Sequence, residues 1–146
     1  MSDNDDLDAL PDSLILELTV YGEARGQGPE EWAAVAWAIR NRVETDLHND
    51  NKPDWWGEGF RGVCLKPKQF SCWNKGDPNR AKMLALPATD PLLERIRIVV
   101  ERVMVSEILD PTGGATHYHT VNTDPDWDDN MEETYRTRSH VFYRGS

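Results

Sequence analysis

Among the residues that could carry chemistry, Glu23 is distinguished by its place in the chain. It lies in VYGEARGQGPEEW, residues 20–32, where an apolar helical pattern gives way to glycine. A carboxyl group at such a helix end can be partly withdrawn from water, which raises its pKa and keeps it protonated near neutral pH. A protonated glutamate can give its proton to a glycosidic oxygen as a general acid. The alternative is a surface salt bridge with Arg25.

The histidines suggest a second chemistry. His117 and His119 lie on the same side of an extended segment, and His140 could add a third nitrogen, so the sequence admits a zinc site. Their spacing matches none of the helical metal motifs, and no acidic partner is evident. We therefore favour hydrogen-bonding or substrate-binding roles for these histidines, and we expect neither a metal nor another cofactor.

Other motifs give weaker signals. The acidic segment 124–133 lacks the glycine and the final glutamate of a calcium loop, so a solvated loop is the better interpretation. Neither Cys64 nor Ser71 lies in a nucleophile elbow. The two cysteines, Cys64 and Cys72, are either a disulfide formed in an oxidising compartment or a pair of reduced core thiols.

Composition restricts the partners. The chain has 146 residues, enough for one domain, and a net charge of -10, which argues against nucleic acid and anionic membranes. No apolar stretch approaches the roughly 20 residues that span a bilayer. The first ten residues are acidic and polar, unlike a secretory signal, so we expect synthesis in the cytoplasm and action elsewhere only after release.

The periodicity predicts a mainly helical fold with a small β or extended element in the C-terminal third. A first helix follows an N-cap at Ser13 and ends near Gly22, and a second covers 29–47. Residues 49–88 have no clear period, which indicates either short helical turns that the pattern cannot place or a functional loop region, and we favour the loop region. A third helix follows Asp90 and continues to Ile108. Short strands are expected at ATHYHT and SHVFYR.

Five blocks, YGEARGQG, AVAWAIRNRV, KPKQFSCW, GGATHYH and SHVFY, follow one another in an order that resembles the SleB-like cell-wall hydrolases. The resemblance runs from Leu14 to Tyr143. It implies a single lysozyme-like domain over residues 13–146, after a flexible acidic segment over 1–12. It also implies cleavage of peptidoglycan glycan strands between N-acetylmuramic acid and N-acetylglucosamine. We expect a monomer that binds these strands and neither nucleic acid nor membrane.

Carried over residue by residue, the resemblance assigns the catalytic glutamate to Glu23. It also implies that the middle and late blocks bind substrate. The residues expected to do so are Gln69, Phe70, Ser71, Thr116, Tyr118 and His119, and we add Trp127 from the late acidic loop. The final block, with His140, Phe142 and Tyr143, is expected to serve packing and hydrogen bonding.

No second carboxylate partner for Glu23 is evident, which favours a lytic transglycosylase that forms a 1,6-anhydro product. Hydrolysis remains open, with Asp124, Asp126 or Asp128 as the base. The third block departs from that of the spore enzymes, and neither a secretion signal nor a wall-binding domain is evident, so a phage endolysin is the expected role. A gene-transfer or prophage lysis cassette would fit equally. Two rivals stay open: a zinc-dependent wall amidase or peptidase that uses the three histidines, and a glycan-binding module without activity.

Overall fold

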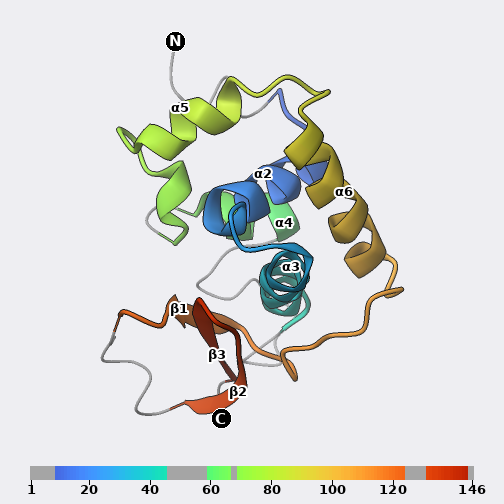
Figure 1. Ribbon diagram of the computed structural model, residues 1–146, viewed down its shortest axis with the longest axis vertical. Helices are drawn as coiled ribbons and strands as arrows, with labels where there is room; N and C mark the ends of the chain where they lie inside the picture. The colour runs from blue at the N-terminus through green and yellow to red at the C-terminus, as the bar shows by residue number, and fades with distance from the viewer. Residues whose placement is uncertain (1–8, 46–58, 67–68, 124–130, 145–146) are drawn as a thin grey trace.

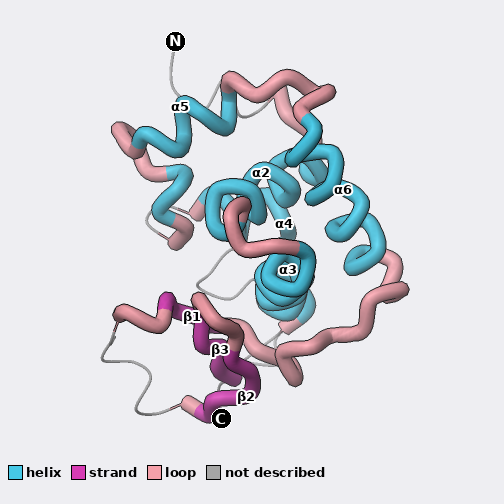
Figure 2. Tube along the Cα trace, in the orientation of Figure 1, coloured by secondary structure: helices cyan, strands magenta, loops and turns pink. Residues whose placement is uncertain are grey.

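A computed structural model describes residues 9–45, 59–66, 69–123 and 131–144. Helices form the larger part of the described chain, and a small antiparallel sheet lies at one end (Figure 1). Coloured by secondary structure, the trace shows that strands and helices occupy separate parts of the molecule (Figure 2). The mainly helical class with a C-terminal β element is therefore confirmed.

Helix α2, Asp12–Ala24, is the central helix. Its apolar side chains point to several sides rather than to one stripe, as a helix surrounded by neighbours requires. Ile15, Leu16 and Val20 are at most 1% exposed. The predicted helix is present, but its N-cap is Pro11 and not Ser13, which lies inside the first turn. The helix also continues through Gly22 and so carries Glu23 in its last turn.

Helix α3, Pro29–Glu44, begins with proline at its first turn and two glutamates beside it, as predicted. Ala34, Ala36 and Ala38 are buried, and their small side chains allow α2 and α6 to pack closely against it. The helix ends before the predicted residue 47, and positions 46 and 47 lie outside the described residues.

The segment predicted to be irregular contains short helices. Helix α4 spans Gly59–Leu65, a 3-10 turn η1 spans Ser71–Trp73, and α5 spans Pro78–Leu84. Short helical turns were therefore the better of the two interpretations, and the sequence could not place them because elements of 7 residues or fewer are too short to show a helical period. The Asp77 side chain accepts a hydrogen bond from the Asn79 backbone N–H at 2.8 Å and so caps α5.

Helix α6, Pro91–Met104, begins as predicted, because Asp90 accepts a hydrogen bond from the Leu93 backbone N–H at 2.9 Å. It ends earlier than the predicted Ile108. Ser106 has a φ of 61°, a left-handed conformation that breaks the helix. Helices α5 and α6 lie on opposite sides of α2 (Figure 1).

The sheet contains β1, His117–Thr120, β2, Glu132–Arg136, and β3, His140–Arg144, in the order β1-β3-β2. Strands β1 and β3 were predicted. Strand β2 was not, because a solvated loop was expected up to residue 133. Its first residues are acidic and exposed, and pairing with β3, not burial, makes them a strand. In the described part of the chain, no helix is long and apolar enough to cross a membrane.

Candidate active site

Glu23 lies where the last turn of α2 faces the sheet. Its Oε1 accepts a hydrogen bond from the Tyr118 hydroxyl of β1 at 2.7 Å. Burial raises the pKa of Glu23, and the hydrogen bonds from Tyr118 and Cys72 oppose that rise, as do the charges of His140 and Arg42. Burial is the largest effect, so the protonated form is favoured beyond that of an ordinary glutamate.

The alternative interpretation of Glu23 as a surface salt bridge does not describe this structure. Arg25 turns away and donates to the Asn79 side-chain oxygen of α5 at 3.0 Å. Its guanidinium carbon also lies 5.1 Å from the centre of the Tyr21 ring. The cation nearest in sequence is therefore engaged elsewhere, and Glu23 meets a neutral hydroxyl.

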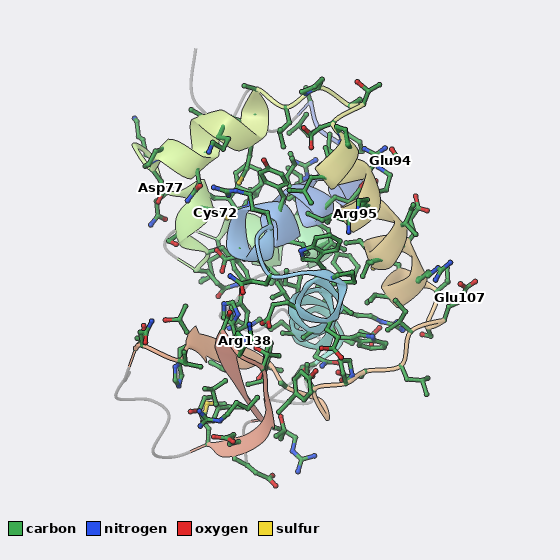
Figure 3. All side chains as sticks on the ribbon, in the orientation of Figure 1. Cys72, Asp77, Glu94, Arg95, Glu107 and Arg138 are labelled. Carbon is green, nitrogen blue, oxygen red and sulfur yellow. The ribbon has the colours of Figure 1, made fainter. Side chains whose placement is uncertain are left out.

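Gly22 lets η1 approach Glu23. A Cβ atom added at Gly22 would lie 2.5 Å from Met83 Sδ and 2.7 Å from Cys72 Cβ, closer than real Cβ contacts come. Any larger residue would therefore push η1 away from α2. Figure 3 labels Cys72 beside α2 and Glu94 and Arg95 on α6, on the other side of the molecule.

Cys72 and Cys64 are both free and buried, so the interpretation as reduced thiols is the one that the structure supports. Burial raises the pKa of both thiols well above the usual value for cysteine. Cys72 therefore keeps its proton, and its thiol can donate the hydrogen bond that Glu23 accepts.

The turn after Glu23 is held on both sides. The Ala24 carbonyl at the end of α2 accepts from Trp32 Nε1 at 2.9 Å and from the Gln27 backbone N–H at 3.0 Å. Ser139, just before β3, donates from its hydroxyl to the Gln27 side-chain oxygen. Together with the Arg25 contact to α5, these bonds fix the direction in which α2 presents Glu23.

Tyr118 is placed by the sheet register. It pairs with Phe142 of β3, and the two ring centres are 5.3 Å apart. The ring of His140 meets Tyr118 edge-on, also at 5.3 Å. His140 Nδ1 lies 2.7 Å from Glu31 Oε2 of α3, and both side chains are 6% exposed. Tyr118 is thus held between two rings of β3.

Arg42 of α3 provides a second link to the sheet. Its Nε donates to the Thr116 carbonyl immediately before β1, and its guanidinium carbon lies 5.5 Å from the centre of the Phe70 ring. Burial lowers the pKa of Arg42, and the neighbouring Glu23 opposes this change. The guanidinium therefore contributes positive charge near Glu23 from a buried position.

The predicted substrate-binding residues differ in their exposure and in whether they contact Glu23. It brings Tyr118 directly to Glu23. Ser71 is exposed at the start of η1, and Gln69 donates from Nε2 to the Val63 carbonyl at 2.8 Å. The prediction for Phe70 needs correction: its ring is 3% exposed and packs in the core, so it supports the site without facing a ligand.

The remaining predicted residues lie around β1. Thr116 is buried, and its hydroxyl lies 2.9 Å from His117 Nδ1. His119 Nε2 lies 2.8 Å from the Tyr143 hydroxyl, on the face of the sheet opposite Tyr118, so the structure does not bring His119 to Glu23. Trp127 lies outside the described residues, as do Asp124, Asp126 and Asp128.

The three histidines considered for zinc lie on two faces of the sheet. His140 shares the face of Tyr118 and bonds to Glu31, whereas His117 and His119 alternate with Tyr118 and lie on the other face. Within the described ranges, no cluster of three or more His, Cys, Asp or Glu side chains could hold a metal ion. The geometry gives no support to the zinc alternative.

Sequence reasoning missed three contributors to this site: Glu31, Arg42 and Cys72. Arg42 belongs to the AVAWAIRNRV block, and Cys72 to KPKQFSCW, so both lay within the segments that carried the resemblance. What the sequence could not show is that α3 and η1 turn these side chains toward Glu23.

Comparison with known families shows what this arrangement belongs to. The family described as Cell Wall Hydrolase matches residues 26–143, most of the chain. The chain therefore belongs to this cell wall hydrolase family, and the SleB-like resemblance is confirmed. Family membership implies peptidoglycan as the substrate. A comparison with curated proteins gives no match.

Two solved structures share the fold. The catalytic domain of the Bacillus cereus SleB protein superposes with a TM-score of 0.67 at 22% identity, covering 91% of this chain and 89% of the other. The catalytic domain of the germination-specific lytic transglycosylase SleB from Bacillus anthracis gives the same score and identity, with 99% and 97% covered. The expected lysozyme-like, mostly helical architecture is confirmed.

Proposed function

We propose that this protein cleaves the glycan strand of peptidoglycan between N-acetylmuramic acid and N-acetylglucosamine, with Glu23 as the acid and then the base. The observation that carries this proposal is the setting of Glu23. Its carboxyl group is withdrawn from water at the junction of helices and sheet, and a neutral hydroxyl holds it at 2.7 Å. Family membership supports the substrate.

In the proposed reaction, the Glu23 carboxyl gives its proton to the glycosidic oxygen while the bond from that oxygen to C1 breaks. The resulting carboxylate then takes the proton from the C6 hydroxyl of the same sugar. The C6 oxygen bonds to C1, which closes a 1,6-anhydro ring, and Glu23 regains its proton. No water is consumed, and no second carboxylate is needed.

The described groups around Glu23 and the name of one structural neighbour support this route, and Asp124, Asp126 and Asp128, the bases considered for hydrolysis, lie outside the described residues. The described groups with the largest influence on its pKa are a tyrosine, a cysteine, a histidine and an arginine, and none of them is a carboxylate. A hydrolase of this type ordinarily places a second carboxylate near the acid. A lytic transglycosylase is also what the structurally similar Bacillus anthracis domain is named.

Tyr118 has a specific part in this proposal. By donating to Oε1 it fixes the orientation of the carboxyl group that is proposed to meet the glycosidic bond. The same hydrogen bond stabilises the carboxylate after the proton has left. Ser71, which is exposed at η1, and Gln69 are proposed to contact the sugar from the other side of Glu23.

The test is Glu23→Gln in a digestion of purified peptidoglycan. General acid catalysis contributes about 10² to 10⁴-fold in rate, so a loss of at least 100-fold is expected with the fold intact. Glu17→Gln is the matched control, because Glu17 is the other glutamate of α2, is buried and pairs with α6. An active Glu23→Gln protein contradicts the proposal.

Mass spectrometry of the fragments decides the reaction type. An anhydro end is lighter than a reducing end by one water. Anhydro ends from the wild-type enzyme support the transglycosylase, and reducing ends assign the step to water.

We also propose an endolysin role, with a monomer made in the cytoplasm and released to the wall, because the polymer lies outside the cell membrane.

A further inference from the structure

Helix α3 contacts the sheet through two side chains on one face. Glu31 and Arg42 are eleven residues apart, which is about three turns and roughly 16 Å along the axis. Eleven steps of 100° return to nearly the same direction, so both point the same way. Glu31 reaches His140 of β3, and Arg42 reaches the Thr116 carbonyl before β1.

The Glu31 end of this face holds the ring that contacts Tyr118. His140 Nδ1 is fixed by Glu31 at 2.7 Å, and the imidazole plane stands at 82° to the Tyr118 ring. An edge-on aromatic contact of this kind is directional, because the ring quadrupole favours it over face-to-face stacking. The orientation of His140 therefore restricts the orientation of Tyr118.

We infer that Glu31 and His140 are positioning residues, whose buried pair orients Tyr118 so that its hydroxyl stays bonded to Glu23. The inference rests on the proposed function, in which Glu23 is the catalytic group. Neither Glu31 nor His140 touches the reacting atoms in this scheme. They act through Tyr118.

A purely structural role explains this pair poorly. Removing two charged or polar groups from water costs free energy that their attraction repays only in part, so a buried pair adds little stability over apolar packing. What the pair offers beyond apolar side chains is direction, because a bond to Nδ1 fixes the plane of the ring. That direction is useful at Tyr118, where a hydroxyl must meet one carboxylate oxygen.

Two routes lead from His140 to Glu23, and an experiment must separate them. The groups that face Glu23 are Tyr118 of β1, Cys72 of η1, His140 of β3 and Arg42 of α3. Next to the pair, burial raises the pKa of Tyr135 of β2, and the charges of Glu30 and Glu31 raise it further. His140 can influence Glu23 through the Tyr118 hydroxyl, or through its own positive charge across space.

The experiment follows the Glu23 carboxyl carbon by ¹³C NMR during a pH titration, with Glu23→Gln used to assign the signal. Tyr118→Phe should raise the pKa of Glu23 by roughly one unit, because a hydrogen bond to the charged form is lost. His140→Asn should produce a rise of similar size. In the Tyr118→Phe background, His140→Asn should add only the smaller direct effect of the His140 charge on Glu23.

A full additional shift in that background would show that the charge of His140 acts directly, and it would overturn the inference. So would an unchanged pKa in His140→Asn. If His140→Asn does not fold, substitutions at Glu31 test the same point. Glu31→Gln keeps an acceptor for His140 Nδ1 and should shift Glu23 much less than Glu31→Ala, whereas equal shifts would contradict a positioning role.

Glu17→Gln again provides the matched control, since the Glu17 side chain is 6% exposed, the same as Glu31. It should leave the Glu23 titration unchanged. The titration needs no enzymatic activity, so the two proposals can fail separately. An active Glu23→Gln variant would remove the proposed function and leave the coupling of Glu31, His140 and Tyr118 to Glu23 standing.

Discussion

Helix α2 carries two glutamates withdrawn from water, Glu17, which is buried, and Glu23, which is half-buried, and they differ in their partners. Glu17 bonds to the Arg97 guanidinium of α6 at 2.7 Å. Glu23, six residues later, bonds to the Tyr118 hydroxyl at the same distance. Burial raises the pKa of both carboxyl groups and is the first cause in each case. Burial alone therefore does not distinguish Glu17, which forms an ion pair, from Glu23, the proposed catalytic acid.

The partner makes the difference. A guanidinium is always charged, so it favours the carboxylate of Glu17 and in turn has its own pKa raised by that carboxylate. Tyr118 is neutral, and burial raises its pKa well above the usual value, so it remains a donor. Glu23 can release and regain a proton beside it without breaking an ion pair.

Gly22→Ala should have the largest effect on stability and activity, because it disturbs the packing around Glu23 and leaves the packing around Glu17 unchanged. Met83 Sδ is the end of a flexible side chain and can move aside, but Cys72 Cβ cannot move without η1. Overpacking of this kind costs about 1–3 kcal/mol of unfolding free energy. We also expect a loss of activity larger than the fraction of unfolded protein explains, because η1 moves away from Glu23.

Urea unfolding and digestion rates at a temperature where both proteins are folded measure this effect. Gly26→Ala is the control, because an added Cβ at Gly26 would meet no atom within 4 Å. It should be neutral, or stabilise by a few tenths of a kcal/mol through the unfolded chain. A Gly22→Ala protein as stable and active as Gly26→Ala would show that the close approach of η1 is unimportant.

Arg97→Ala tests the comparison of the two glutamates at Glu17, because it removes the guanidinium that bonds to the Glu17 carboxylate. Removing one partner of a largely buried pair should cost about 1–3 kcal/mol at neutral pH. The loss should depend on pH. The pKa of Glu17 is raised in the folded state, so its contribution is fully present below the ordinary glutamate pKa and is lost as the pH rises through the folded value.

Without Arg97 that folded pKa rises further, so the stability of Arg97→Ala should fall more steeply than that of wild type from about pH 4.5 upward. Denaturant unfolding across pH 4 to 8 measures the slope. Adding Glu17→Gln should make the slope shallower than that of wild type, because the raised pKa of Glu17 no longer contributes. Glu94→Gln, which removes the exposed partner of Arg97, should change little. Parallel curves for wild type and Arg97→Ala would contradict this account.

The same contrast explains how far the sequence reaches. Helices α2, α3 and α6 were predictable because each is long enough for a period of 3.6 residues, and because Pro29, Asp90 and Pro91 announce two of the starts. The short elements between 59 and 84 were not. They depend on packing against α2, and the Gly22 contact that holds η1 joins residues fifty positions apart.

For the site, too, local patterns were predictable from the sequence and long-range contacts were not. Glu23 was predicted from a local pattern together with the family blocks, and its role remains a prediction that the mutant must test. The link from Glu31 to His140 joins residues 109 positions apart, and each looks ordinary in its own segment. Phe70 was misassigned for the converse reason, because an aromatic residue in a block looks the same whether it is buried or faces a ligand.

Asp90→Ala should have the smallest effect and sharpen the comparison at the α6 end. Asp90 accepts from the Leu93 N–H, and losing such a cap costs about 1 kcal/mol. Arg97 lies beyond the first turn of α6, where fraying does not reach, so the Glu17 pair should survive. Urea unfolding should therefore show a nearly constant loss from pH 4 to 8, and digestion should proceed at the wild-type rate. A loss that grows with pH would mean that the cap also holds Arg97 against Glu17. The position of Glu17 would then depend on a contact outside its own ion pair, as the position of Glu23 depends on η1 and the sheet.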